Sequence, residues 1–228
     1  MIPPRLAALL GSRVARTNPW SLVSAAEYEA YLGPGGADEL APLSTIFAKV
    51  YAARRPRRLA VLGVATGNGL EHVDLHLTGR TVGVDVNLTF LAVARQRFIR
   101  LGPALELLCA DVERVDLGEG RFDLVHAALV LEYVDVRVVI PRIAAWLVPG
   151  GASSVVLELP GGQAVTESRY PSVRALAGAT RLVPPEELRK LTEAEGLVEH
   201  RAFVVPLANG RRYFAALYEK PQGRGTQK

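Results

Sequence analysis

Short, nearly continuous apolar runs alternate with helical patterns through the middle of the chain. The runs typical of strands cover residues 58–63, 81–85, 104–109, 122–127 and 152–159. Between them, apolar residues have helical spacing near residues 68–77, 88–101 and 135–147. A strand that is apolar at nearly every position must be covered on both faces. The alternation therefore predicts a doubly wound α/β sheet of mostly parallel strands with right-handed crossovers.

The C-terminal part has a different pattern. A helix over residues 184–196 precedes two strand-like runs, 197–206 and 212–219, which are joined by Ala208-Asn209-Gly210. An Asn-Gly pair between two strands is typical of a hairpin, so the sheet should finish with an antiparallel pair. The polar tail, residues 221–228, is expected to be disordered.

The N-terminal part is helical in pattern. Residues 21–53 have helical spacing that Gly33-Pro34-Gly35-Gly36 interrupts, which predicts two helices with Asp38 as the N-cap of the second. We expect residues 1–56 to form a helical extension over a sheet domain of residues 57–220. Trp20, Tyr28 and Tyr31 favour a lid over a ligand site, although a helix pair simply packed on the sheet has the same pattern.

Composition and charge exclude several classes. The 228 residues are 49% hydrophobic, but no apolar run approaches the roughly 18–20 residues of a membrane span. The net charge is +4, and 23 of the 27 basic residues are arginine, which suits either phosphate binding or a compositional bias. Because +4 is small for this length, nucleic acid is not expected as a partner. The run Arg54-Arg55-Pro56-Arg57-Arg58 has no interleaved aromatic residues, so it predicts a solvated face or a helix C-terminus contact.

The single cysteine, Cys109, excludes an internal disulfide and a multi-cysteine metal site. No metal site is predicted. The start of the chain has no apolar segment behind it that would indicate a signal peptide. These observations predict a cytoplasmic protein, and they say nothing of its oligomeric state.

A glycine-rich turn follows the first strand, in the sequence Gly63-Val64-Ala65-Thr66-Gly67-Asn68-Gly69. Such a turn lets the backbone approach a ligand at the carboxyl edge of the sheet, and a helix starting there would point its N–H groups at an anionic group. A tight strand-to-helix turn also needs glycine for purely steric reasons. The turn alone therefore leaves a binding site and a structural role open.

Acidic residues follow the next two strands. Asp85 ends the second strand, sixteen residues after Gly69, and Asp111 follows the third. A carboxylate in the position of Asp85 can accept two hydrogen bonds from a ribose diol, each worth roughly 1.5–3 kcal/mol. Asp85 could instead cap the next helix, but Asn87, directly before Leu88, is better placed to do so.

The order of these segments resembles the class I S-adenosylmethionine-dependent methyltransferases over residues 57–220. The segments that carry the resemblance are the glycine-rich turn, Asp85, Cys109–Asp111, Phe122-Asp123-Leu124-Val125 and Leu147-Val148-Pro149-Gly150-Gly151. The resemblance implies a seven-stranded sheet of order 3-2-1-4-5-7-6 with strand 7 antiparallel. It implies S-adenosylmethionine as the cofactor and methyl transfer to a small molecule as the function.

The resemblance also implies cofactor contacts. The turn would lie against the methionine part, Asp85 would hold the ribose and Asp111 would meet the adenine. The full set of expected cofactor residues is Gly63, Val64, Ala65, Gly67, Asn68, Gly69, Asp85, Val86, Asn87, Ala110, Asp111, Val112, Ala127 and Tyr28. The family usually has an acid where Gly63 stands and a glycine where Ala65 stands, so the cofactor's ammonium would be held by backbone carbonyls or by the N-terminal region.

Two other functions share parts of this pattern. An NAD(P)-dependent oxidoreductase shares the turn and the acid, but its fingerprint needs a small residue where His72 stands. A protein that binds S-adenosylmethionine or its demethylated product without transferring a methyl group fits the missing acid at Gly63. A P-loop is excluded, because no Gly-Lys-Ser/Thr occurs.

The segment after the fourth strand, residues 126–134, lacks the Asn/Asp-Pro-Pro-Tyr of many nucleic-acid and protein amino methyltransferases and resembles small-molecule methyltransferases. It supplies the candidate catalytic residues His126, Glu132 and Tyr133. His126 could equally be a buried histidine satisfied locally, and Glu132 and Tyr133 could cap or pack the next helix. Residues 161–180 are expected to form another wall of the pocket.

Overall fold

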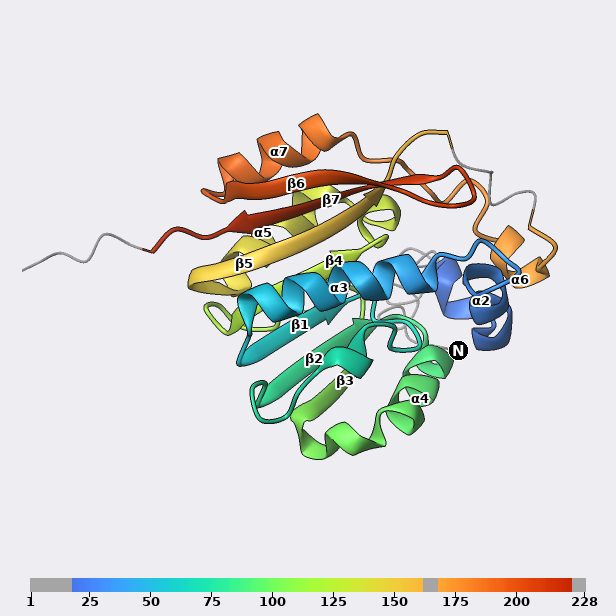
Figure 1. The fold of residues 1–228 in the computed structure, drawn as a ribbon, viewed down its shortest axis with the longest axis horizontal. Helices are drawn as coiled ribbons and strands as arrows, with labels where there is room; N and C mark the ends of the chain where they lie inside the picture. Colours follow the sequence, from blue (N-terminus) through green and yellow to red (C-terminus); the bar gives the residue numbers. More distant parts are fainter. Residues whose placement is uncertain (1–17, 162–167, 223–228) are drawn as a thin grey trace, which may run out of the picture.

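Seven strands form one sheet in the order β3-β2-β1-β4-β5-β7-β6 (Figure 1). The structure is a computed structural model, and it describes residues 18–161 and 168–222. The strands are β1 (Arg58–Leu62), β2 (Arg80–Asp85), β3 (Leu105–Cys109), β4 (Phe122–Ala128), β5 (Leu147–Glu158), β6 (Val198–Pro206) and β7 (Arg212–Glu219). Neighbours from β3 to β5 pair in parallel, and β7 pairs antiparallel with both β5 and β6. The predicted fold class and strand order are confirmed.

Helices cover both faces of this sheet. The α-helices are α2 (Ala25–Leu32), α3 (Leu40–Arg54), α4 (Leu88–Arg97), α5 (Val136–Trp146), α6 (Pro171–Arg174) and α7 (Pro185–Ala194). Short 3-10 turns are η1 (Pro19–Leu22), η2 (Leu70–His72), η3 (Ile99–Ala104) and η4 (Leu131–Tyr133). In Figure 1, α3 lies along one face of the sheet and α5 lies on the opposite face.

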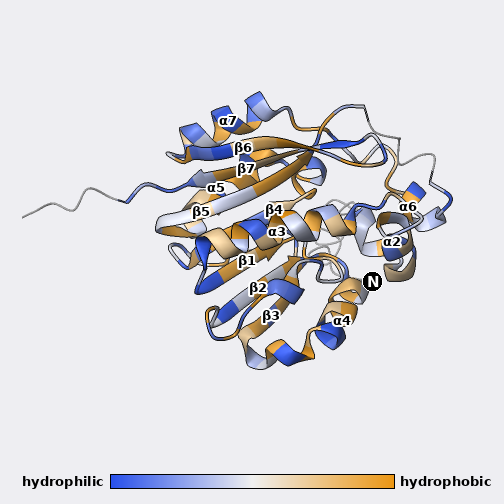
Figure 2. Cartoon of the chain, in the orientation of Figure 1, coloured by the Kyte–Doolittle hydropathy of each residue, from blue (hydrophilic) through white to orange (hydrophobic). Residues whose placement is uncertain are grey.

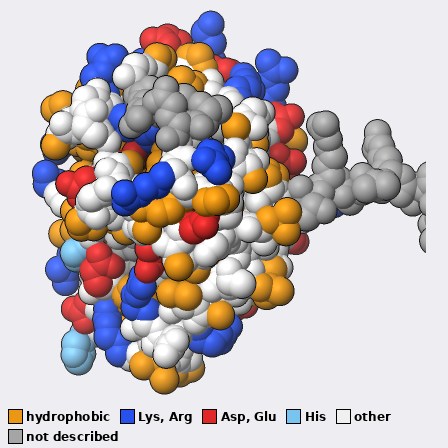
Figure 3. All heavy atoms as spheres, turned by 90° about the vertical axis from the view of Figure 1, so that its right-hand side faces the viewer, with side chains coloured by type: hydrophobic (Ala, Val, Ile, Leu, Met, Phe, Trp, Pro, Cys, Tyr) orange, Lys and Arg blue, Asp and Glu red, His pale blue; other side chains and the backbone are white. Residues whose placement is uncertain are grey.

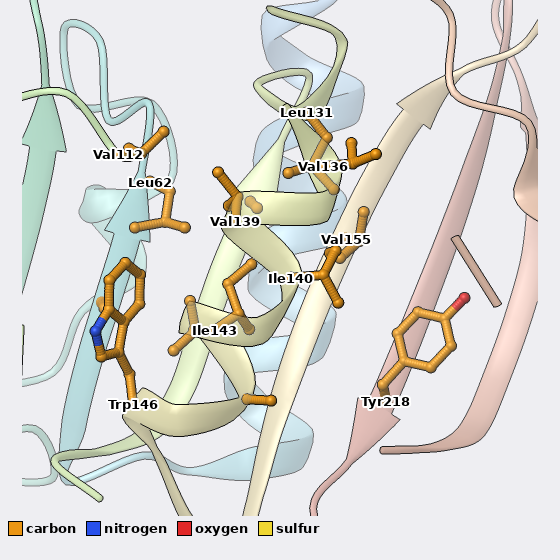
Figure 4. Close-up of a cluster of buried hydrophobic side chains, with 14 of the residues drawn as sticks. Leu62, Val112, Leu131, Val136, Val139, Ile140, Ile143, Trp146, Val155 and Tyr218 are labelled. Atoms are coloured by element: carbon orange, nitrogen blue, oxygen red, sulfur yellow. The ribbon is translucent and has the colours of Figure 1, made fainter. Parts of the chain in front are cut away.

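The larger core lies between the sheet and the helices α5 and α7. Val136, Val139, Ile140 and Ile143 of α5 are fully or almost fully buried against the strands, as Figure 4 shows. Much of β1 and β4 is coloured as hydrophobic in Figure 2, in agreement with burial on both faces. The continuous apolar runs of the sequence therefore reflect burial between two helical layers.

The helix predicted over residues 68–77 is wrong. The chain there makes only the single turn η2, followed by turns that lead into β2. Gly67 and Gly69 have φ of +93° and +97°, which interrupts a right-handed helix before it can start. The N-terminal helix α3 occupies this face instead, where Phe47 and Tyr51 pack with Leu59, Val61 and Leu70.

Several smaller expectations need correction. Asp38 is not the N-cap of α3, because it has φ of +54° and Glu39 precedes the helix without a side-chain capping bond. The fifth strand begins at Leu147 rather than residue 152, so the Leu-Val-Pro-Gly-Gly segment lies inside it. The Asn-Gly hairpin is confirmed, with Gly210 at φ of +80°. The tail predicted to be disordered lies outside the described residues from residue 223 onward.

Candidate functional site

A pocket lies along the carboxyl ends of the parallel strands, and its empty volume is about 1120 Å³. Its walls come from the turns after β1 to β4, the end of β5, the N-terminal helices and the segment around α6. Figure 3 shows this side of the molecule, where acidic and basic side chains stand among apolar ones. Because parallel strands all end at one edge, residues that are distant in sequence meet here.

Eight of the fourteen expected cofactor residues line this pocket. They are Gly63, Ala65, Asp85, Val86, Ala110, Asp111, Val112 and Tyr28. They extend from the end of β3 to the end of β1, with Tyr28 added from α2. The structure therefore brings together the acids after two strands, the first residues of the glycine-rich turn and an aromatic side chain of the N-terminal extension.

Asp85 is buried and joins two elements of the site. Its Oδ2 accepts a hydrogen bond from the Ala65 backbone N–H at 2.9 Å, and its Oδ1 accepts one from the Asn87 N–H at 2.9 Å. Burial raises the pKa of this carboxyl, and the backbone N–H donors oppose that shift. Each carboxylate oxygen keeps a further lone pair, so the group can still accept hydrogen bonds from a ligand.

The other six expected cofactor residues do not line the pocket. They are Val64, Gly67, Asn68, Gly69, Asn87 and Ala127. A Cβ at Gly67 would lie 2.4 Å from the ring of Phe98, and one at Gly69 would lie 2.9 Å from the ring of Phe47. These two glycines are therefore required by packing and by their left-handed backbone, which is the steric role left open for the turn.

Asn87 is the N-cap of α4, as its position predicts. Its Oδ1 accepts hydrogen bonds from the N–H groups of Thr89 at 2.9 Å and Phe90 at 3.2 Å. Its amide also donates to the carbonyls of Trp20 and Val23, each at 2.8 Å. One buried side chain therefore starts α4 and anchors the segment before α2.

A side chain from the turn after β4 occupies the space beside Gly63, where the family usually has an acid. Gly63 lines the pocket with φ of +63°, and a Cβ built on it would meet Cγ2 of Val130 at 3.0 Å. An acidic side chain at this position would be strained in its backbone and would have to displace Val130. The structure thus explains in steric terms why glycine stands here.

Aromatic side chains close one side of the pocket. Trp20 packs edge-on against Tyr133 with ring centroids 4.9 Å apart, and Tyr28 lies 4.8 Å from Phe90. Burial raises the pKa of Tyr28, and the nearby charge of Asp85 raises it further. Val173, Leu176 and Thr180 add a wall from residues 161–180 as expected, while residues 162–167 of that segment lie outside the described part.

The three candidate catalytic residues fall in different places. His126 does not line the pocket; it is buried with Nδ1 3.1 Å from Ser154 Oγ and its ring edge-on to Phe47. Burial lowers the pKa of His126 to about 4. The geometry is that of a neutral, locally satisfied core histidine.

Glu132 and Tyr133, by contrast, both line the pocket from η4. Glu132 is 2% exposed; its Oε1 accepts the Glu158 N–H at 2.8 Å, and its Oε2 has no hydrogen-bond partner among the described residues. Burial raises the pKa of Glu132 to about 7 and that of Tyr133 to about 12. Glu132 is therefore a carboxyl group poised to exchange a proton near neutral pH.

A buried charged cluster in the pocket wall was not found from the sequence. Arg211 is ion-paired with Glu39, and its Nε lies 3.6 Å from Glu158 Oε1. The hydroxyl of Tyr213 donates to Glu39, and Arg211 donates to the hydroxyl of Tyr31 at 3.3 Å. Residues 39 and 211 are far apart in sequence, so no local pattern could have indicated this pairing.

The described residues contain neither a metal-binding cluster nor a membrane-spanning helix. Among residues 18–161 and 168–222, no group of three or more His, Cys, Asp or Glu side chains is arranged to hold a metal ion. No helix in the same part of the chain is long and apolar enough to cross a membrane.

The central segment of the chain is similar to known proteins. A family described as a methyltransferase domain matches residues 61–155. The ubiquinone biosynthesis O-methyltransferase of Bradyrhizobium diazoefficiens is 38% identical over 95 residues, which are 41% of this chain and 37% of that protein. The chain thus aligns with little more than a third of that relative's length.

Solved structures share the fold over most of the chain. The phosphoethanolamine N-methyltransferase 2 of Haemonchus contortus, in complex with S-adenosyl-L-methionine, aligns with a TM-score of 0.66 at 16% identity, over 87% of this chain and 57% of that one. The [4+2]-cyclase SpnF aligns with a TM-score of 0.65 at 18% identity, over 96% of this chain and 93% of that one. At these identities the similarity shows the fold.

Proposed function

Starting from residues 61–155 as a methyltransferase domain on a class I sheet, we propose that this protein transfers a methyl group from S-adenosylmethionine to a small-molecule acceptor. One observation carries the proposal. A single pocket contains the acids that follow β2 and β3, the turn after β1 and a closing layer of aromatic side chains. This combination suits a nucleoside held at the carboxyl edge of the sheet.

The residues of the pocket fit this cofactor. Asp85 has lone pairs left for the two ribose hydroxyls, and Ala110, Asp111 and Val112 line the end of the pocket where an adenine would lie. Gly63 and Ala65 leave room beside the turn after β1 for the methionine part. Bound there, S-adenosylmethionine would supply an electrophilic methyl group for in-line displacement.

The cofactor's ammonium has no acid at position 63 to hold it. Along the sheet edge between Asp85 and Glu132, the described pocket wall has no carboxylate, while Gly63, Ala128 and Leu129 line it. We infer that backbone carbonyls of the turns after β1 and β4 accept the ammonium hydrogens. Backbone carbonyl dipoles would then replace the usual contact between the ammonium and a carboxylate. We therefore expect Asp85 and Asp111 to contribute a large share of the binding free energy of the cofactor.

The aromatic layer gives the N-terminal extension a function. Trp20, Tyr28 and Tyr31 line the pocket from residues before the sheet, and Asn87 ties that segment to α4. We propose that this segment is a lid that excludes water from the reacting groups. Excluding water strengthens the electrostatic interactions of Asp85 and Glu132 within the site.

Calorimetry tests the cofactor assignment. The protein is titrated with S-adenosylmethionine, with S-adenosylhomocysteine and with NAD under the same conditions. We expect the first two to bind and NAD not to bind. Binding of NAD alone would overturn the assignment in favour of an oxidoreductase.

A second candidate is a protein that binds S-adenosylmethionine without transferring its methyl group. The glycine at position 63 favours keeping it, because the acid that usually stands there in the methyltransferases is missing. Formation of S-adenosylhomocysteine in the presence of acceptors separates the two candidates. Cofactor binding without turnover of any acceptor supports the second.

A further inference from the structure

The pocket extends beyond the part that the cofactor would occupy. In the sheet order, β3, β2 and β1 carry the proposed cofactor contacts, and β4, β5 and β7 follow. Neighbouring strands are about 4.8 Å apart, so β7 lies about 14 Å from β1. Pocket-lining residues from this far side include Glu132 after β4, Glu158 at the end of β5 and Arg211 before β7. On the proposed function, on which this inference rests, that region is the place of the acceptor.

Carboxylates outnumber cations in this region. Glu39, Glu132 and Glu158 line it, and among the described lining residues the one basic side chain is Arg211. Arg211 is already paired with Glu39 and lies within ion-pair distance of Glu158. Its charge is compensated inside the protein, so an anionic acceptor would meet an excess of negative charge.

Glu132 provides an independent observation. It is almost fully buried in the pocket wall, and its Oε2 has no partner among the described residues. A buried carboxylate oxygen without a donor is costly unless a ligand supplies one. Burial raises the pKa of Glu158 as well as that of Glu132; at Glu158 the charge of Arg211 opposes this shift and the charge of Glu39 adds to it.

We propose that the acceptor is a small amine, bound as its ammonium ion by Glu132 and Glu158. An ammonium group presents several N–H donors and one positive charge, which is what the unpartnered Glu132 Oε2 and the excess of carboxylates require. Glu132 then takes one proton from the ammonium nitrogen. The nitrogen keeps the electron pair of that N–H bond and would form the new N–C bond with it. The bond that breaks is the one between the methyl carbon and the sulfonium sulfur, whose electron pair stays on the sulfur. S-adenosylhomocysteine is then the leaving group, and the methylated amine is formed as its ammonium ion.

The curated relative does not argue against an amine. Its name describes an O-methyltransferase, but the methyltransferase domain matched in this chain ends at residue 155. Glu39, Glu158 and Arg211 all lie outside residues 61–155. Of the charged side chains of the acceptor region, Glu132 lies inside the matched domain, and the other three lie outside it.

Binding measurements with matched probes test the proposal. Two sets share one carbon skeleton each: 2-phenylethylamine, 2-phenylethanol and phenylacetate, and hexylamine, hexan-1-ol and hexanoate. Each compound is titrated into the protein with and without saturating S-adenosylhomocysteine. We expect at least one amine to bind at least tenfold more tightly than the alcohol and the carboxylate of its set. Equal or tighter binding of the alcohols or carboxylates, or no binding of either amine, would overturn the proposal.

Variants test whether Glu132 and Glu158 cause the preference for amines. We expect Glu158→Gln and Glu132→Gln each to weaken binding of the amine at least tenfold, and Glu119→Gln, an exposed acid before β4, to leave it unchanged. Unchanged amine binding in both pocket variants contradicts the proposal. Binding of S-adenosylhomocysteine is measured in parallel. If that binding is intact while the amines fail, the amine proposal falls alone, and if it is absent in the wild type, the proposed function falls instead.

Discussion

At the scale of single residues, Asp85 connects structure and binding through one carboxylate. Its two oxygens already hold the backbone of Ala65 and Asn87, so the group is oriented before any ligand arrives. On the proposed function, this orientation makes Asp85 the residue on which a contact to the cofactor's ribose would depend most. It also means that a substitution acts on the turn after β1 as well as on the ligand.

We expect Asp85→Asn to weaken binding of S-adenosylhomocysteine at least tenfold, about 1.4 kcal/mol. An amide has one accepting oxygen where the carboxylate has two, so it cannot serve both backbone donors and a ribose diol. Calorimetry gives the dissociation constant, and circular dichroism at the same temperature verifies that the variant is folded. An unchanged dissociation constant in the folded variant contradicts the ribose role.

His126 gives a prediction about pH. Its pKa is lowered from 6.5 to about 4 in the folded protein, so the unfolded chain binds more protons between these values. The stability that comes from keeping this histidine neutral is complete above pH 6.5 and is lost as the pH falls toward 4. We expect a loss of about 2 kcal/mol in the free energy of unfolding between pH 7 and pH 5.

Urea unfolding of the wild type and of His126→Asn at both pH values measures this loss. The variant should be less stable at pH 7, because it leaves a gap in the core, but its stability should fall less on going to pH 5. A decrease with pH that is equal in both proteins would show that other groups cause it.

The sequence predicts the place of some site residues in the fold and not of others. Asp85 and Asp111 could be placed because Asp85 is the last residue of β2 and Asp111 stands two residues after β3, and the ends of parallel strands meet at one edge of the sheet. The pairing of Glu39 with Arg211 depends on α3 lying against β7, which no local pattern encodes. His126 could not be assigned from sequence, because one apolar strand gives no sign of whether a side chain faces core or pocket.

At the scale of elements, the side chain of Asn87 connects α4 to the proposed lid by hydrogen bonds. We expect Asn87→Ala to lower the free energy of unfolding by about 1–2 kcal/mol from the lost cap alone. The loss should be larger in practice, because the carbonyls of Trp20 and Val23 lose their donor. Because the segment before α2 is then no longer anchored, we also expect weaker cofactor binding.

Chemical unfolding and limited proteolysis test whether Asn87 anchors the segment before α2. Cleavage near residues 18–23 should become faster in Asn87→Ala than in Asn209→Ala, a matched change of an exposed asparagine that donates to a backbone carbonyl. Equal cleavage rates and equal cofactor affinity in both variants contradict a lid held by Asn87.

The sequence predicts the strands well, because they are buried on both faces of the sheet. It predicts the segment after β1 poorly, because turns there have the apolar spacing of a helix. The strands could be predicted because apolar side chains are needed on both faces. Leu70, Val73 and Leu77 have helical spacing, but they belong to turns that fill the space beneath α3 rather than to a helix of their own. Spacing alone cannot distinguish these cases, since both bury the same side chains.

At the scale of the whole molecule, the arginine excess is partly explained by internal contacts. Arg54 is ion-paired with Glu219, and Arg58 is paired with Asp123 at 3.0 Å. Arg100 donates to three backbone carbonyls in the turns after β1. These guanidinium groups hold the layers together, which leaves less of the positive charge for a partner.

Ligand binding should stabilise the whole fold. At a concentration one hundred times its dissociation constant, S-adenosylhomocysteine should stabilise the folded state by about 2.7 kcal/mol. For a chain of this length we expect the unfolding midpoint to rise by about 5–10 °C in a thermal scan. NAD at the same concentration serves as the control and should leave the midpoint unchanged. An equal rise with NAD would contradict the cofactor assignment.

The position of α3 has a consequence for how the chain folds during synthesis. Leu43 and Ile46 pack with Val156, Tyr213 and Ala215, so their partners leave the ribosome more than a hundred residues later. Closing contacts of such separation is slow, and the apolar side of α3 stays uncovered in the meantime. Completion of the fold therefore waits for the C-terminal hairpin, and nascent chains that end before β7 should depend on chaperones to stay free of aggregates.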